Sequence, residues 1–350
     1  MNTLPVEMMG RAVRVLPLLL LVLLVALMTP LIAASFGAAD IQVSQVLQVV
    51  IAQLTGQSQG DISSRIIMEL RLPRIMMAFV AGFGLAIAGA VLQTVTRNPL
   101  ADPYLFGISS GASFGAVVVI TLLGGVSVDS GAWLSHVSLP VGAFLGASVA
   151  VLMVLALCGR SLSTQIERML LSGVAISFMF GALTSLLLYF SGPQAAASVL
   201  FWSLGSFAKA SWATLWLPLV VVAVCTLTIL LFKRQIIAIK AGDETAHTLG
   251  INVQRLRLNI LLLCSLITAV LVANCGGIGF VGLMVPHIVR LLLPGRFALL
   301  TTGIVGGLFM IWVDVLARCL LSYQELPIGI ITAVIGSGFF LFILGGKRGR

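Results

Sequence analysis

Charged residues are scarce in this sequence. Asp, Glu, Lys and Arg make up only 9% of its 350 residues, whereas hydrophobic residues make up 59%. Soluble domains carry about 25% charged residues, so the composition excludes an ordinary soluble protein. Apolar runs of about 20 residues, the length that crosses a lipid bilayer, recur along the chain. The sequence therefore predicts an all-α polytopic membrane protein.

Residues that bind nucleotides, metals or coupling ions are also missing. No phosphate-binding loop of the form GxxxxGK[ST] occurs, and the centres of the apolar runs are not supplied with Asp, Glu, Lys or His that could carry a proton or sodium ion. His136, His247 and His287 are isolated from one another, and the five Cys are scattered without a CxxC pair. We expect no cofactor, no metal site and no catalytic residue. Energy must therefore come from a partner, or the chain is a passive conduit.

Ten spans are expected, and the whole chain, 1–350, is expected to form one transmembrane domain. Arg11 and Arg14 precede the first apolar run, but its length and the many later spans favour a retained helix over a signal peptide. With both termini cytoplasmic, 15 of the 20 Lys and Arg residues lie on the inside, as the positive-inside rule requires. The basic charge thus reflects topology and gives no reason to expect a nucleic-acid partner. The spans are about 15–35, 74–95, 105–124, 138–158, 168–190, 212–232, 258–275, 279–293, 298–320 and 327–345.

Three segments between the spans have features of their own. Segment 36–70 holds apolar residues among glutamines and predicts a short amphipathic helix on the outer surface, and segment 191–212 predicts a second interfacial segment. In the cytoplasmic loop 233–257, Gly242 and Asp243 form a candidate N-cap, Glu244 to Leu249 a short helix, and Gly250 a stop signal. From the residues alone, this loop is either an ordinary solvated loop or a coupling element.

Small residues recur at every fourth position in several spans. Gly82, Ala86 and Ala90 lie four apart, and Gly107, Gly111 and Gly115 form two overlapping GxxxG steps. Such spacing lets helix backbones approach closely. The same spacing marks the fifth and tenth spans, where close packing and the lining of a pathway remain alternatives: Gly173, Ser177 and Gly181, and Gly329 and Ala333.

Four strings carry a resemblance to a known family. They are RLPR, QTVTRNPLADPYLFGISSGASFGA, GGIGFVGLMVPHIVR and ELPIG, in this order along the chain. They resemble the membrane permease subunit of the ABC importers for ferric siderophores, haem and vitamin B12, the FecCD-type permeases. The resemblance implies a type II importer fold in the bacterial cytoplasmic membrane. It also implies two ATPase subunits, a soluble substrate-binding protein, and a second permease subunit that is either identical or a paralogue.

The resemblance also assigns roles to residues of this sequence. Arginines in the RLPR and DxxAR strings would dock the binding protein. From the residues alone, the alternatives are snorkelling at the membrane interface or, for Arg318, an i,i+4 pair with Asp314. Gln165 replaces a small hydroxyl residue of the vitamin B12 branch. The implied sites are binding-protein docking at Arg71, Arg74 and Arg318; ATPase coupling at Ala241, Gly242, Asp243, Glu244, Ala246, Leu249 and Gly250; a cytoplasmic gate at Ser163, Thr164 and Gln165; and a pathway along the fifth and tenth spans.

The expected function is that of a non-catalytic permease subunit of an importer for an iron chelate, a siderophore or haem. A cobalamin importer of the same family is the alternative within this class. Two alternatives come from other classes. An ion-gradient-driven secondary transporter would need intramembrane ionisable residues, and a membrane enzyme would need paired His or acidic residues at the membrane face.

Overall fold

The computed structural model describes residues 4–37, 39–56, 60–122, 132–158, 166–293, 298–321 and 323–346, and these residues form helices joined by short connections, with no strand among them. In chain order the elements are α1 Leu4–Ser35, α2 Val43–Leu54, α3 Ile62–Arg65, the π-helix η1 Ile66–Arg71, α4 Leu72–Val95, the 3-10 helix η2 Pro103–Phe106, α5 Ile108–Leu122, α6 Ala132–Cys158, α7 Ile166–Tyr189, α8 Pro193–Ser203, α9 Trp212–Leu231, α10 Lys233–Ala241, α11 Asp243–Thr248, α12 Val253–Cys275, α13 Val281–Leu292, α14 Leu299–Cys319 and α15 Ile328–Gly346. The all-helical membrane architecture predicted from the sequence is confirmed.

Each of the ten expected spans falls on one of these helices. Within the described residues, six helices are long and apolar enough to cross a membrane, among them Ile62–Val95 and Val253–Cys275. The expected span 279–293 is shorter than predicted: α13 has 12 residues, about 18 Å at 1.5 Å per residue, against a hydrocarbon core about 30 Å thick. It is a half-length helix, because the chain before it is not helical.

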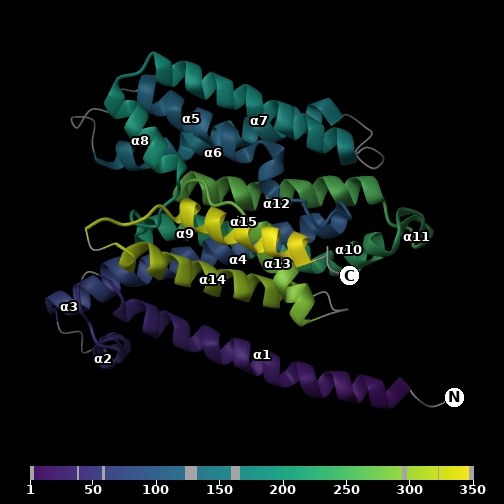
Figure 1. Cartoon of the computed structure of the whole chain (residues 1–350), viewed down its shortest axis with the longest axis horizontal. Helices are drawn as coiled ribbons and strands as arrows, with labels where there is room; N and C mark the ends of the chain where they lie inside the picture. Colours follow the sequence, from purple (N-terminus) through teal and green to yellow (C-terminus); the bar gives the residue numbers. More distant parts are fainter. Residues whose placement is uncertain are drawn as a thin grey trace.

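Helix α4 lies at the centre of the molecule and packs against α9, α12, α13 and α14. Figure 1 shows α5, α6, α7 and α8 gathered on one side of this central group, and α1 on the opposite side beside α14. The start of α1 and the short helix α11 lie at one end of the bundle, and α2 and α3 lie at the other. This arrangement agrees with a topology in which the N-terminus and the 233–257 loop share one side of the membrane.

Glycines set the closest helix contacts, as their spacing predicts. A Cβ added to Gly82 of α4 would lie 2.1 Å from the carbonyl oxygen of Gly306 in α14, and one added to Gly115 of α5 would lie 2.0 Å from that of Gly142 in α6. Only a residue without a side chain allows backbones to approach so closely. The four-residue repeats therefore fix how α4 packs on α14 and how α5 packs on α6.

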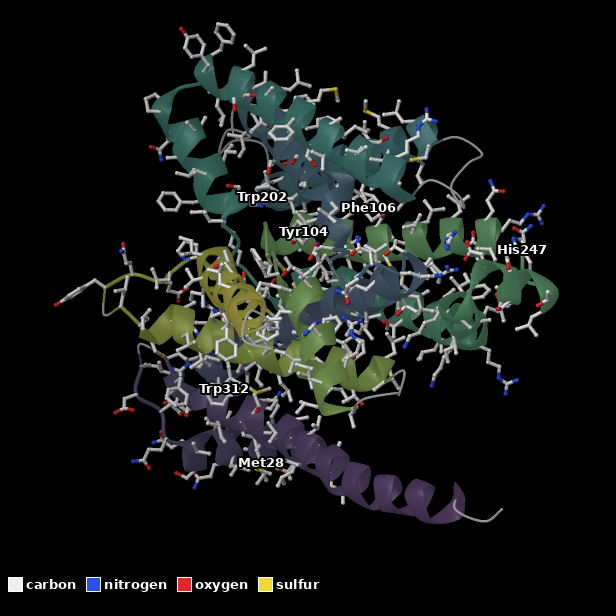
Figure 2. The ribbon with its side chains drawn as sticks, turned by 45° about the vertical axis from the view of Figure 1, so that its right-hand side comes forward. Met28, Tyr104, Phe106, Trp202, His247 and Trp312 are labelled. Carbon is white, nitrogen blue, oxygen red and sulfur yellow. The ribbon has the colours of Figure 1, made fainter. Side chains whose placement is uncertain are left out.

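The chain is broken between α12 and α13, at 276–280. Gly276 and Phe280 both adopt positive φ, 74° and 68°, and the hydroxyl of Tyr104 accepts a hydrogen bond from the backbone amide of Ile278 at 2.9 Å. Figure 2 shows Tyr104, with Phe106 and Trp202, between the α5 to α8 group and the rest of the bundle. A backbone amide freed by the break is thus satisfied by protein rather than left in lipid.

Two of the segments between the spans were expected to lie at the membrane interface, and each holds a short helix. Helix α2 lies in the 36–70 segment and α11 in the 233–257 loop, where short helices were predicted, and α8 lies in the 191–212 segment. Helix α10 was missed because Lys233, Arg234 and Lys240 make the segment resemble a polar loop, whereas Ile236 and Ile239 are fully buried. Helix α10 is therefore stabilised by packing against α4 and α9, a contact that hydropathy does not indicate.

Candidate functional site

The arginines of the RLPR and DxxAR strings meet at the end of the bundle that holds α2 and α3. Arg74 donates from Nε to Asp314 Oδ1 at 2.9 Å, and from Nη1 and Nη2 to the two carboxylate oxygens of Glu325 at 2.9 and 2.8 Å. Arg318 Nε lies 3.1 Å from Asp314 Oδ2, the i,i+4 pair that the sequence allows. Asp314 is completely buried, whereas the side chain of Glu325 is 46% exposed.

Arg71 belongs to the same cluster but has no carboxylate partner among the described residues. Its Nη1 donates to the carbonyl oxygens of Ala34 and Ser35 at 2.6 and 3.0 Å, and its Nη2 donates to that of Ala39 at 2.6 Å. Carbonyls at the end of a helix have no partner within the helix and carry partial negative charge. Arg71 therefore caps α1 and holds it against the start of α4.

This geometry differs in one respect from what the resemblance implied. Arg71, Arg74 and Arg318 do lie together on the predicted outer side, but their guanidinium groups are occupied by groups of this chain. Sequence reasoning missed Glu325. The signal that could have found Glu325 was its place as the acidic residue of the ELPIG string, between the last two spans. The cluster has three cations and two anions, so the described side chains leave one positive charge in excess.

At the other end of the bundle, α11 is attached to the central helices through Asp243. The carboxylate of Asp243 accepts hydrogen bonds from Arg97, which follows α4, and from Arg257 of α12, the latter at 2.9 Å. Arg97 Nε also donates to the Ile239 carbonyl at 3.1 Å, and Arg257 Nε to that of Val95 at 3.2 Å. The first residue of α11 is thus joined to the ends of both α4 and α12.

The rest of the predicted coupling segment divides into a buried and an exposed side. Ala246 is completely buried, and Leu249 is 66% exposed; Ala241 and Glu244 are also exposed. The turns on either side need glycine, because Gly242 and Gly250 have φ of 145° and 76°. Figure 2 shows His247, on the same helix, at the far end of the molecule. Helix α11 is a fixed protrusion with an exposed apolar residue.

The predicted pathway residues are placed differently from one another. A Cβ on Gly173 would lie 2.0 Å from the Leu105 carbonyl oxygen, and one on Gly329 would lie 2.4 Å from that of Leu204, so both positions serve close packing. Ser177 donates to the Gly173 carbonyl, Gly181 faces open space, and Ala333 is half-buried. The gate residues Ser163, Thr164 and Gln165 lie outside the described residues.

Helix α7 presents a broad apolar face. Only 17% of the most apolar 18-residue stretch of its candidate span, Arg168–Tyr189, is buried within the protein. Large side chains such as Leu171, Phe178 and Leu186 are 53% to 76% exposed. Val334 and Phe342 of α15 are exposed in the same way, at 66% and 82%. These faces are available to lipid or to another subunit.

The comparisons with known proteins agree with this arrangement. Residues 18–345 match the model of the FecCD transport family. The cobalamin import system permease protein BtuC of Halobacterium salinarum is 39% identical over 287 residues, which cover 81% of this chain and 74% of the relative. The hemin transport system permease protein HmuU of Yersinia pestis is 34% identical over 337 residues, covering 96% and 98%.

A solved structure has the same fold. It is described as an inward-facing conformation of an ABC transporter of metal-chelate type, and it is 30% identical, with a TM-score of 0.80 over 94% of this chain and 99% of the other. The family match covers most of the chain, and the membrane architecture is that of its relatives. The chain therefore belongs to the FecCD transport family and is a permease subunit of an ABC importer.

Proposed function

We propose that this chain is the permease subunit of a binding-protein-dependent importer for an iron chelate, a siderophore or haem, in a bacterial cytoplasmic membrane. The names of relatives for hemin and for iron chelatin support this choice. The 39% identity to a cobalamin permease makes cobalamin the second candidate. Two permease subunits, identical or paralogous, would form the pathway, and two ATPase subunits would drive it.

The anchored helix α11 carries the proposal. A coupling element must pass force from a partner to the membrane helices, and this requires a rigid attachment. Asp243 supplies the attachment through Arg97 and Arg257, and Leu249 supplies an exposed apolar contact for the ATPase. A displacement of α11 would be transmitted to α4, the most deeply buried of the long helices, and from there to α14 and α12.

On the outer side, the arginine cluster is the proposed dock for the binding protein. Because Arg74 already holds Glu325, a carboxylate of the binding protein would replace the partly exposed Glu325 rather than meet a free arginine. Glu325 precedes α15 by three residues, so its release would loosen the start of that helix. Docking of the binding protein and movement of α15 would then be linked, because both depend on Arg74 exchanging Glu325 for a carboxylate of the binding protein.

The exposed faces of α7 and α15 are the proposed walls of the pathway. Both helices carry large apolar side chains with no cover from this chain in its described residues. A second permease subunit facing them would enclose an apolar route with few polar anchors. Such a route gives little chemical selectivity, so selection among chelates would rest with the binding protein.

Replacement of Leu249 by Asp tests the coupling assignment. An aspartate in an apolar contact would be desolvated without a partner, so the ATPase should no longer co-purify with the permease. Leu54→Asp is the matched control, because Leu54 is 82% exposed and lies on α2, at the opposite end. Normal co-purification of the ATPase with the Leu249 variant would refute the coupling role.

The substrate is tested with the complete transporter in liposomes. Uptake driven by ATP should be seen with a ferric siderophore or haem when the matching binding protein is present. Uptake of cobalamin alone would select the second candidate. Uptake driven by an ion gradient without ATP would contradict both.

A further inference from the structure

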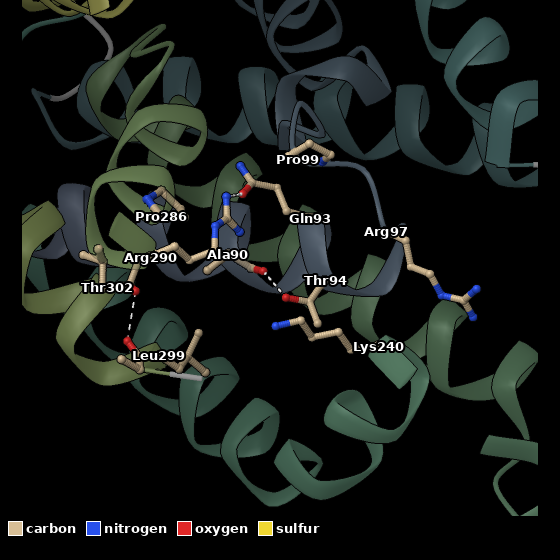
Figure 3. A pocket seen from close by; sticks show the side chains of 12 residues that line it. Ala90, Gln93, Thr94, Arg97, Pro99, Lys240, Pro286, Arg290, Leu299 and Thr302 are labelled. Atoms are coloured by element: carbon tan, nitrogen blue, oxygen red, sulfur yellow. Dashed lines mark hydrogen bonds between the residues drawn. The ribbon is translucent and has the colours of Figure 1, made fainter. Parts of the chain in front are cut away.

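A pocket lies at the predicted cytoplasmic end of the bundle, where α4, α13, α14 and α10 converge. It has a volume of about 340 Å³, within the range of about 300 to 1,000 Å³ that is typical of small-ligand sites. Figure 3 shows Lys240 extending along Thr94 into this pocket, with Arg290 on the neighbouring wall and Arg97 at the rim.

The pocket carries an excess of positive charge. Its described lining includes Arg97, Lys240 and Arg290 and contains no Asp or Glu. Asp243 neutralises part of the charge of Arg97, but it is shared with Arg257. Within the described part of the chain, no carboxylate lies within ion-pair distance of Lys240 or Arg290.

Arg290 is held in place by a buried amide. Gln93, which is 3% exposed, donates from Nε2 to the Gly282 carbonyl at 3.0 Å, and its Oε1 accepts from Arg290 Nη2 at 2.5 Å. One guanidinium N–H is used in this way, and a guanidinium has five. The lone glutamine in the second span therefore orients a cation that lines the pocket and keeps further N–H donors.

We propose that this pocket binds a phosphate-bearing anion between Lys240 and Arg290. Basic pockets between transmembrane helices on the cytoplasmic side bind anionic lipid headgroups, and arginine binds phosphate oxygens through paired N–H groups. Thr94 of α4 and Thr302 of α14 also line the pocket, and their hydroxyl groups donate to the carbonyl oxygens of Ala90 and Ala298. The phosphate is supplied either by an inner-leaflet lipid or by a soluble phosphate compound, and both present the same chemistry to these residues.

The position of the pocket gives this anion a structural role. Lys240 is on α10, the helix that leads into α11, and Arg290 is on α13, which packs against α4. An anion bound to both would join the coupling segment to the membrane helices at a second point, beside the Asp243 attachment. The proposal concerns binding and does not depend on which chelate is transported.

The test uses the purified transporter with phosphatidylglycerol, phosphatidylcholine or inorganic phosphate as probes. Retained phosphatidylglycerol is measured by native mass spectrometry for the wild type, Lys240→Gln, Arg290→Gln and the control Lys233→Gln. Lys233 is on the same helix but does not line the pocket. Removing one cation should weaken phosphatidylglycerol binding about fivefold, and the control should match the wild type.

Each outcome decides the proposal or the source of the phosphate. Selective loss of phosphatidylglycerol in both pocket variants supports the lipid. Equal retention of both lipids, with inorganic phosphate binding that is lost in the pocket variants, supports a soluble phosphate compound. The proposal is overturned if neither probe distinguishes the pocket variants from Lys233→Gln. Lys240 is exposed and does not belong to the buried core, so its variant remains informative even if Arg290→Gln fails to fold.

Discussion

Arg74 and Glu325 are joined by two parallel hydrogen bonds of 2.9 and 2.8 Å, although they lie 251 residues apart in the sequence. Bidentate pairs of this kind are among the strongest side-chain contacts. Here one partner is nearly half exposed, which makes the pair open to competition. Arg74 also binds the buried Asp314, so it would stay in place if Glu325 were released as proposed.

The proposed exchange of partners at Arg74 predicts how Glu325→Gln changes the affinity for the binding protein. Glutamine is uncharged and holds Arg74 less tightly, so the binding protein should dock about two- to fivefold more tightly. Titration of the binding protein against the detergent-solubilised transporter measures this. Glu69→Gln, in the exposed pair with Arg65, is the control and should not change affinity. Weaker docking of the Glu325 variant would contradict the exchange.

Asp314 is expected to be a stability residue. Asp314→Asn removes the carboxylate that lies between Arg74 and Arg318 and leaves two buried cations with one partly exposed anion. Breaking a buried pair by removing one partner destabilises a protein by about 3 to 5 kcal/mol. Thermal unfolding of the purified chain should show a clear loss of stability. Glu325→Gln, in the same network, should lose much less, and equal losses would show that burial of Asp314 is unimportant.

The contact between α4 and α14 predicts that replacement of Gly82 destabilises the protein. The added methyl of Gly82→Ala would lie 2.1 Å from the Gly306 carbonyl oxygen, and separating the helices should destabilise the protein by about 1 to 3 kcal/mol. Gly338→Ala is the matched control, since a Cβ at that helical position meets nothing within 4 Å. Thermal unfolding compares the two variants. A Gly82 variant as stable as the control would show that the helices can move apart freely.

Asp102, in the connection between α4 and α5, predicts a dependence of stability on pH. Its Oδ1 accepts a hydrogen bond from the Tyr104 amide, but burial raises the pKa of the carboxyl to about 6. Because the folded state favours the protonated form, stability should fall as the pH rises through about 6. Asp102→Asn keeps the acceptor without the charge. It should raise the melting temperature at about pH 7.5 and leave it nearly unchanged at about pH 3, below the ordinary pKa of the carboxyl.

The opposite pH dependence would show that the Asp102 carboxylate is stabilised in the folded protein. In that case Asp102→Asn would lower the melting temperature at the higher pH. The wild-type curve, recorded over the same pH range, is the reference for both results.

Much of the fold could be predicted from local sequence signals. Hydropathy located the long helices, because each must remain apolar over the length that crosses the bilayer. The four-residue glycine spacing of α4 and α5 predicted close contacts, because positions four apart share one helix face. The short helix at α11 followed from Gly242 and Gly250 in the same local way. The position of Leu249 on an exposed surface agreed with the predicted coupling role, which stays a prediction.

Some features of the sites could not be predicted from the sequence. The short length of α13 and the existence of α10 were not predicted. Hydropathy does not distinguish a buried short helix from a full span, as at α13, or from a polar loop, as at α10. The partners of Arg74, Arg97 and Arg290 are 251, 146 and 197 residues away from them, and no local pattern encodes such a separation.

The sequence by itself determined that the chain crosses the membrane repeatedly and which family it resembles, since composition and short motifs carry that information, and it predicts that both ends face the cytoplasm. Only the tertiary structure decided that the outer arginines already hold carboxylates of this chain, and that Lys240 and Arg290 share a pocket without an acidic lining residue in the described chain. The physical reason is that helix packing brings together charges from distant segments, and the free energy of a charge depends on its neighbours in space.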